Sequence, residues 1–185
     1  RDLGMSIESR DVPSDDINIL LSHAHWDHIQ GFPFFAPAYM PGFEIDVHAP
    51  HNVDKDVESI FVGQLDRAYF PVQIEDMQAE LRFDDLGEES LKIGDVTVSW
   101  TYAVHPGAAV GYKIEVGGRR LAFLPDNEFL KGYRGDPALL TEHDEQLAMH
   151  RQQLAFLADV DILIHEAQYT NPEYASKIGW GHSSV

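Results

Sequence analysis

The sequence predicts a mixed α/β or α+β fold in which helices cover sheets. Three observations lead to this class. Short apolar runs of strand length recur along the chain, polar or glycine-containing turns separate them, and one longer segment carries leucines at helical spacing. The chain has 185 residues, 44% of them hydrophobic, and shows neither a repeat nor a clear linker, so we expect residues 1–185 to form a single domain.

The first part of the chain alternates strand-like and helix-like segments. A buried strand is predicted over 17–22, where β-branched and apolar residues are bounded by polar ones. The aromatic, proline-rich stretch 31–37 predicts a short helix that breaks into a loop. A second strand is predicted over 43–48, and Asn52 is placed to cap a helix across 53–66.

Strand signals dominate the second part. Five strands are predicted there, over 79–84, 90–93, 95–104, 109–116 and 120–125. Between the last two, Gly117-Gly118 indicates a tight hairpin turn. A helix is predicted over 142–158, where leucines recur on one face, and a further buried strand over 161–164.

Composition narrows the range of functions. The formal charge is −18, from 31 acidic and 13 basic side chains, so the surface should repel long nucleic acids. The alternative is that the acids only solvate the surface, and in either case nucleic-acid binding is not favoured. The absence of cysteine excludes disulfides and thiolate metal ligands. No apolar stretch approaches the roughly 18 residues of a membrane span, so no membrane partner is expected, and the cytoplasm is the default location.

The run His23-Ala24-His25-Trp26-Asp27-His28 follows the first predicted strand. It places three imidazoles and a carboxylate on one short loop. Zinc takes nitrogen and oxygen ligands of this kind, and catalytic zinc sites keep one coordination position open for water. Four potential ligands in one run are enough for two adjacent metal ions if partners arrive from elsewhere in the chain.

Three further candidate ligands lie where strands end or in a loop. His105 follows the strand predicted over 95–104, and Asp126 follows the one over 120–125. His182 lies in a glycine-flanked loop near the C-terminus. Catalytic side chains commonly project from loops held by a rigid sheet.

This ordered set resembles the metallo-β-lactamase superfamily, whose signature is an HxHxDH run followed by a His, an Asp and a final His. The resemblance is strongest to the phosphodiesterase and tRNA 3′-processing (RNase Z-like) branch. It is supported by the segments His105-Pro106-Gly107, Val110-Gly111-Tyr112-Lys113-Ile114, Leu163-Ile164-His165-Glu166-Ala167 and Gly181-His182-Ser183. The resemblance implies a four-layer αββα sandwich.

The resemblance also implies a ligand set for two metal ions. One ion would be bound by His23, His25 and His105, the other by Asp27, His28 and His182, and Asp126 would bridge them. Zinc is expected, with manganese and iron as alternatives.

The implied function is a metal-dependent hydrolase that uses hydroxide held by two divalent ions. The expected substrate is a small anionic ester, a phosphodiester such as a cyclic nucleotide or a short nucleotide diester. Asp27, His165 and Glu166 are expected to be catalytic, with His165 assisting proton transfer and Glu166 orienting it; a hydrogen-bonded structural role is the alternative for His165. Other possible functions are a thioester or lactone hydrolase, a tRNA 3′-processing nuclease and a metal-binding sensor domain without turnover. A homodimer is left open.

Some segments depart from the typical pattern. Asp126-Asn127-Glu128 replaces the Gly-Asp-Thr of typical RNase Z sequences, and no glycine- and basic-rich arm for tRNA is visible. Superfamily members usually place several strands before the HxHxDH run and a helix and a strand after the last histidine. We therefore expect the chain to be an internal portion of a longer one. The remaining histidines are not expected to bind metal: His48, His51, His143 and His150.

Overall fold

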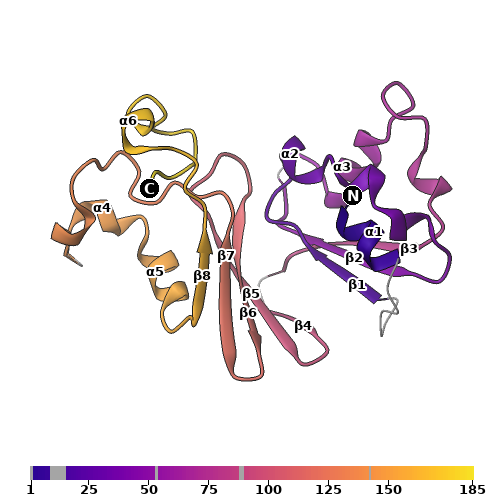
Figure 1. Ribbon diagram of the computed structural model, residues 1–185, viewed down its shortest axis with the longest axis horizontal. Coiled ribbons are helices and arrows are strands. Elements are labelled where there is room, and N and C mark those ends of the chain that lie inside the picture. Colours follow the sequence, from indigo (N-terminus) through magenta and orange to yellow (C-terminus); the bar gives the residue numbers. More distant parts are fainter. Residues whose placement is uncertain (1, 9–15, 53, 88–89, 142) are drawn as a thin grey trace. The chain divides into compact units, whose positions relative to one another are not determined.

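The computed structural model describes residues 2–8, 16–52, 54–87, 90–141 and 143–185. The chain divides into two compact units, Arg1–Gly87 and Glu88–Val185 (Figure 1). Each unit contains one β-sheet with helices, which confirms the mixed α/β class. The single-domain organisation stays a prediction. Among the described residues, no helix has the length and apolar character needed to span a bilayer.

Unit 1 is built around a parallel three-stranded sheet in the order β1-β2-β3. Between the strands the chain forms short helices, as expected for parallel neighbours that need crossover connections. Its elements are α1 (Asp2–Glu8), β1 (Asp16–Leu20), α2 (Trp26–Ile29), η1 (Phe32–Phe34), η2 (Ala36–Tyr39), β2 (Glu44–Ala49), α3 (Val57–Gln64), η3 (Ile74–Asp76) and β3 (Glu80–Asp85).

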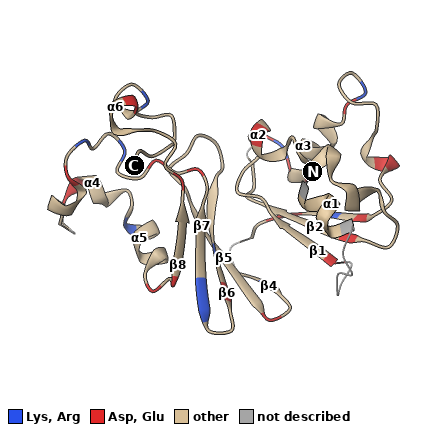
Figure 2. Ribbon diagram, viewed as in Figure 1, with Lys and Arg blue, Asp and Glu red and all other residues tan. Residues whose placement is uncertain are grey.

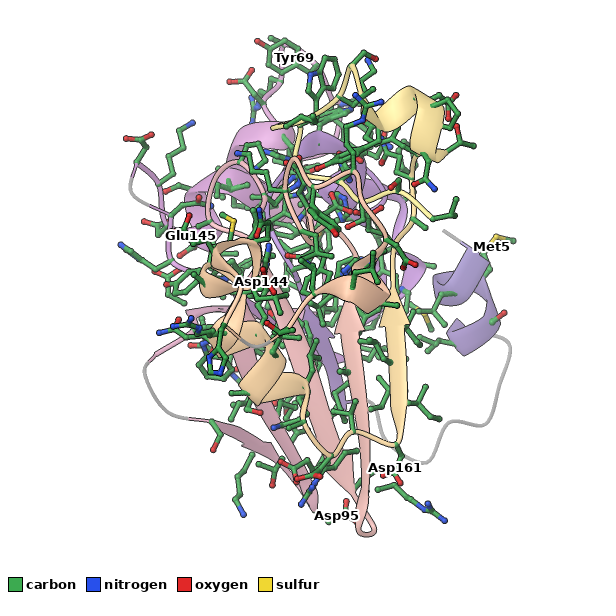
Figure 3. The ribbon with its side chains drawn as sticks, turned by 90° about the vertical axis from the view of Figure 1, so that its left-hand side faces the viewer. Met5, Tyr69, Asp95, Asp144, Glu145 and Asp161 are labelled. Atoms are coloured by element: carbon green, nitrogen blue, oxygen red, sulfur yellow. The ribbon has the colours of Figure 1, made fainter. Side chains whose placement is uncertain are left out.

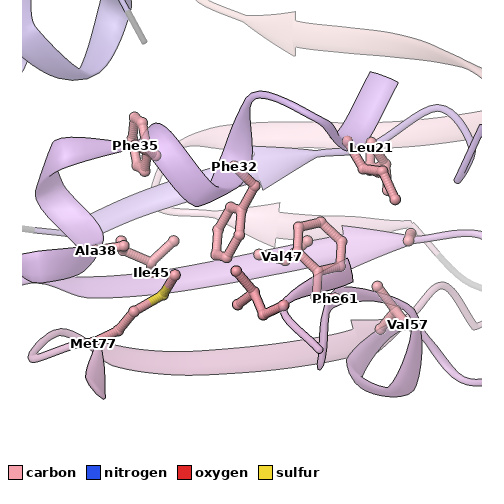
Figure 4. Close-up of a cluster of buried hydrophobic side chains, with 12 residues drawn as sticks. Leu21, Phe32, Phe35, Ala38, Ile45, Val47, Val57, Phe61 and Met77 are labelled. Atoms are coloured by element: carbon pink, nitrogen blue, oxygen red, sulfur yellow. The ribbon is translucent and has the colours of Figure 1, made fainter. Parts of the chain in front are cut away.

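The core of unit 1 lies between the helices and one face of this sheet (Figure 4). Ile45 and Val47 alternate along β2 and are fully buried. Phe61 of α3 and Phe32 of η1 pack over them with their rings edge to face, 4.6 Å between centroids. This packing holds β1, and with it the histidine run that follows β1, against a rigid layer.

The helix predicted over 53–66 is shorter than expected. It begins after Asp56, whose carboxylate accepts a hydrogen bond from the Ser59 N–H at 2.7 Å. The prediction that Asn52 caps the helix is therefore wrong: an aspartate four residues later satisfies the first turn instead. Residue 53 lies outside the described residues.

Unit 2 contains a five-stranded sheet in the order β4-β5-β6-β7-β8. Strands β4 to β7 are antiparallel neighbours, whereas β8 pairs with β7 in parallel. Gly117 and Gly118 form the β6–β7 hairpin turn with φ angles of 56° and 75°, as predicted. The elements are β4 (Leu91–Ile93), β5 (Val96–Tyr102), β6 (Val110–Val116), β7 (Arg119–Leu124), η4 (Pro137–Leu139), α4 (Glu145–Ala148), α5 (Arg151–Leu157), β8 (Ile162–His165) and α6 (Asn171–Tyr174).

Two predictions for unit 2 need correction. The helix predicted over 142–158, whose first residue lies outside the described residues, is two helices, α4 and α5. His150 separates them: it is fully buried and accepts a hydrogen bond from the Leu130 N–H at 3.0 Å. The strand β8 exists, but it is not buried: Ile162, Leu163 and Ile164 are 47–55% exposed, and because successive side chains point to opposite faces, the described residues cover both faces of β8 only in part.

Candidate metal centre

The histidine run of unit 1 brings three imidazole rings together. The chain leaves β1, and α2 begins directly after His25, so the run folds into a single tight turn. Nε2 of His23 lies 3.0 Å from Nδ1 of His25, and the ring centroids of His23 and His28 are 4.1 Å apart. His23 is buried, and its Nδ1 contacts Ser22 Oγ at 3.1 Å, which orients the ring.

Asp27 is placed differently from these histidines. Its side chain is 72% exposed, and its carboxylate lies 3.5 Å from Nε2 of His28. Position 27 is the second residue of α2, so its carboxylate stands in the first turn of a short helix. The predicted roles of Asp27 in metal binding and catalysis stay predictions.

In unit 2, the ends of two strands and the C-terminal loop bring His105, Asp126 and His182 together. One donor atom of each residue lies within 4.8 Å of the other two. His105 Nε2 is 3.6 Å from Asp126 Oδ2, and the rings of His105 and His182 are 4.9 Å apart. Ligands at about 2.0–2.2 Å from a tetrahedral zinc ion are separated by about 3.5 Å from one another, so this group fits such an ion.

The backbone partner of His105 shows which of its ring nitrogens is available to a metal ion. Its Nδ1 donates a hydrogen bond to the Gly181 carbonyl at 2.8 Å. This leaves the lone pair on Nε2, the nitrogen that faces Asp126. Metal-binding histidines usually donate their other N–H to a carbonyl or carboxylate in this way. The close approach also requires glycine at 181, because a Cβ there would collide with His105 and Pro106.

Glu166 lies behind His182. Its Oε1 is 3.8 Å from His182 Nδ1, and it also accepts a hydrogen bond from the Ser183 N–H. Nδ1 of His182 is buried without a hydrogen-bond partner among the described residues. A carboxylate beside the outer nitrogen of a metal-binding histidine holds the ring orientation and raises its basicity.

His165 is part of a hydrogen-bonded network. Its Nδ1 donates to the Glu166 carbonyl at 2.6 Å, and its Nε2 accepts from Nδ2 of Asn127 at 3.0 Å. The orientation of the Asn127 amide follows from its oxygen, which accepts from the Val104 N–H and from Gln153 Nε2, both at 2.8 Å. The neutral form of His165 satisfies both contacts.

Two residues that support the site were not identified as such from the sequence: Asn127 and Glu128. Glu128 is 1% exposed, and its carboxylate accepts hydrogen bonds from the Tyr174 hydroxyl and from the N–H groups of Gly179 and Gly181. It therefore fixes the loop that presents His182. The only signal in the sequence is the departure of Asp126-Asn127-Glu128 from the family pattern.

Three of the other histidines have polar partners. Nε2 of His48 lies 3.0 Å from Asn18 Oδ1, and Nδ1 of His51 lies 2.9 Å from Asp85 Oδ2. Nδ1 of His150 donates to Gln153 Oε1 at 3.2 Å.

Comparisons of the sequence and the fold with known proteins identify the family of the chain. A family model described as "Beta-lactamase superfamily domain" matches residues 8–185. No curated protein matches the sequence. Among solved structures, the chain is similar to the metallo-beta-lactamase fold protein YhfI from Bacillus subtilis, with 16% identity and a TM-score of 0.56, covering 90% of this chain and 55% of YhfI.

Two further structures are similar. The short form of human tRNase Z has 16% identity and a TM-score of 0.58, with 97% of this chain and 69% of that chain covered. A diphosphatase from the PhnP family has 19% identity and a TM-score of 0.53, with 92% and 53% covered. The chain thus spans about half of the length of YhfI and of the diphosphatase, and at these identities the likeness shows the fold alone. The family model, matched over nearly the whole sequence, shows that the chain belongs to the metallo-β-lactamase superfamily.

Proposed function

We propose that the protein is a metal-dependent hydrolase of phosphodiesters, with a cyclic nucleotide or a short nucleotide diester as its substrate. The observation that carries this proposal is the group formed by His105, Asp126 and His182, in which the outer nitrogen of His105 is bonded to a carbonyl and that of His182 faces a carboxylate. In metal sites, the nitrogen of a histidine ligand that does not face the metal typically contacts a carbonyl or a carboxylate in this way.

We propose that both ligand groups serve one centre with two divalent ions. The residues that would hold the ions are those assigned by the resemblance: His23, His25, Asp27, His28, His105, Asp126 and His182. Divalent ions in such sites supply a nucleophile from water at neutral pH and stabilise negative charge on a phosphoryl oxygen. Histidine and carboxylate ligands suit zinc, and also accept manganese or iron.

The chain's own residues would position the ligands and handle protons. Glu166 would keep the His182 ring aligned through its outer nitrogen. A role of His165 in proton transfer requires that one of its two hydrogen bonds breaks when substrate binds. Replacement of His165 by Ala tests this role, because unchanged turnover with intact metal content would rule it out.

A phosphodiester is favoured over a carbonyl ester for two reasons. Two of the similar structures, a tRNase Z and a diphosphatase, bear names that refer to phosphorus esters or anhydrides. The acidic ligand at position 126 fits the phosphodiesterase pattern of the superfamily, and the chain has no cysteine for the thiolate used by some lactamases. Long RNA is a poorer fit for a chain of formal charge −18.

The test combines elemental analysis of the purified protein with hydrolysis of bis-p-nitrophenyl phosphate and of a thioester panel. We expect about two metal ions per chain and hydrolysis of the phosphodiester. Replacement of His182 by Ala should lower metal content and turnover together, whereas the same change at the exposed His143 should alter neither. Metal without hydrolysis of any ester would instead indicate a sensor domain, and thioester hydrolysis alone would contradict the choice of substrate.

A further inference from the structure

A large aromatic side chain stands exposed beside the last metal-ligand candidate. Trp180 precedes His182 by two positions and is 58% exposed. The Lys177 ammonium lies over its ring, 3.7 Å from the ring centroid. Trp180 therefore offers an exposed aromatic surface within two residues of a candidate metal ligand, and aromatic rings of this kind can stack on flat ligands.

The backbone holds Trp180 in a fixed position. It lies between Gly179 and Gly181, which adopt φ angles of +88° and +87° that favour glycine. The N–H groups of both glycines donate to the buried Glu128 carboxylate at 2.8–3.1 Å. The Trp180 N–H donates to the Lys177 carbonyl at 3.0 Å. A rigid exposed ring loses little entropy when a flat ligand stacks on it.

Two lysines lie at the loop around Trp180, although the protein is strongly acidic. The chain has only 13 basic residues against 31 acidic ones, and Figure 2 shows few blue segments. Lys177 covers the indole, and the end of the Lys131 side chain approaches Gly179, with Nζ 3.9 Å from the place that a Cβ would take. Positive charge at the loop that carries His182 would offset the overall repulsion of an anionic substrate.

We infer that Trp180, Lys177 and Lys131 form a recognition platform for a nucleotide, which stacks its base on the indole face opposite Lys177 and places its phosphate near the two ammonium groups. The inference rests on the proposed function and deepens it, since it selects nucleoside phosphodiesters over simple alkyl ones. Stacking of a base on an aromatic side chain changes binding by about 5- to 150-fold.

The test compares two substrates with the same leaving group: the p-nitrophenyl ester of thymidine 5′-monophosphate and methyl p-nitrophenyl phosphate. Replacement of Trp180 by Ala should raise KM for the nucleoside ester at least 5-fold and leave the methyl ester unchanged, with kcat little altered. Trp180→Phe should restore part of the effect, because phenylalanine keeps a smaller stacking face. The matched control is Tyr69→Ala, since Tyr69 is an exposed aromatic residue of unit 1 (80%) that points into solvent (Figure 3).

Equal effects of Trp180→Ala on both esters would overturn the inference while leaving the hydrolase proposal intact. If the native protein hydrolyses neither ester, the proposed function fails, and binding decides the inference separately. In that case calorimetric titration with adenosine 5′-monophosphate should show binding that weakens at least 5-fold in Trp180→Ala. Binding that is absent, or that is the same in both proteins, would overturn it.

Discussion

Replacement of the buried Glu128 by Ala is expected to destabilise unit 2 strongly. The carboxylate accepts hydrogen bonds from Tyr174 Oη at 2.8 Å, from the Gly179 N–H at 2.8 and 3.1 Å, and from the Gly181 N–H at 3.1 Å. Tyr174 is 4% exposed and Gly181 is buried, so water cannot readily replace the lost acceptor at these two donors.

The magnitude follows from these two donors. Each buried donor left without an acceptor costs about 1–3 kcal/mol, so Glu128→Ala should lower the free energy of unfolding by about 2–6 kcal/mol. Glu128→Gln keeps one acceptor oxygen and nearly the same shape, and should cost about half as much. Glu173 offers a matched control, because its exposed carboxylate caps α6 through Thr170 but does not bind the 179–181 loop.

The assay is urea unfolding followed by far-ultraviolet circular dichroism. The order of stability should be native protein, Glu128→Gln, then Glu128→Ala. A loss below about 1 kcal/mol for Glu128→Ala would show that the loop does not depend on this carboxylate, and the reasoning would be refuted.

Three further outcomes are expected. Gly181→Ala should lower metal affinity at least 10-fold in a chelator competition, because a Cβ at this place would displace His105; unaltered affinity would contradict this. Burial lowers the pKa of His150 below its unfolded value of about 6.5, so its contribution to stability should be complete above that pH and should decline as the pH falls below it. Between about pH 7.5 and 5, the urea midpoint of unfolding should therefore decline less in His150→Gln than in the native protein. Phe61→Ala should cost unit 1 about 3–5 kcal/mol in urea unfolding through lost packing on Phe32, and a cost below 1 kcal/mol would argue against that core.

The strands could be predicted because their signals are local. Apolar and β-branched runs, with Gly117-Gly118 between the β6 and β7 segments, are enough to place every strand within about two residues. Burial of a strand is a different property, since it depends on what covers the sheet. The run at Ile162–His165 is apolar enough for a core strand, yet it ends the sheet and stays exposed.

Helix boundaries were predicted less well because tertiary contacts decide them. Leucine spacing indicates one helix over 142–158, but the His150 ring bonds to Leu130 and Gln153 and interrupts it. The spacing of leucines along the chain does not reveal a hydrogen bond to a residue twenty positions away. Asp56 is a different case: its hydrogen bond to the Ser59 N–H is local, and an aspartate at the start of a helix is a signal that the sequence contains.

The candidate ligands could be found from residue type and spacing, whereas the groups that orient them could not. His105, Asp126 and His182 follow strands or a glycine-flanked turn, and the structure brings them together. Glu128 acts on a loop fifty residues later in the sequence, through backbone N–H groups that any residue possesses. Only the folded chain reveals such a partner.

Strand β8, which ends its sheet among the described residues, has a practical consequence for work with the protein. In the β7–β8 register, Phe123 lies opposite Ile164 and Leu121 opposite Ile162, so apolar side chains line this edge of the sheet. An exposed apolar rim of this kind promotes edge-to-edge pairing between molecules. Concentrated preparations will therefore tend to aggregate, and a lysine introduced at position 162 is the simplest means to keep them dispersed.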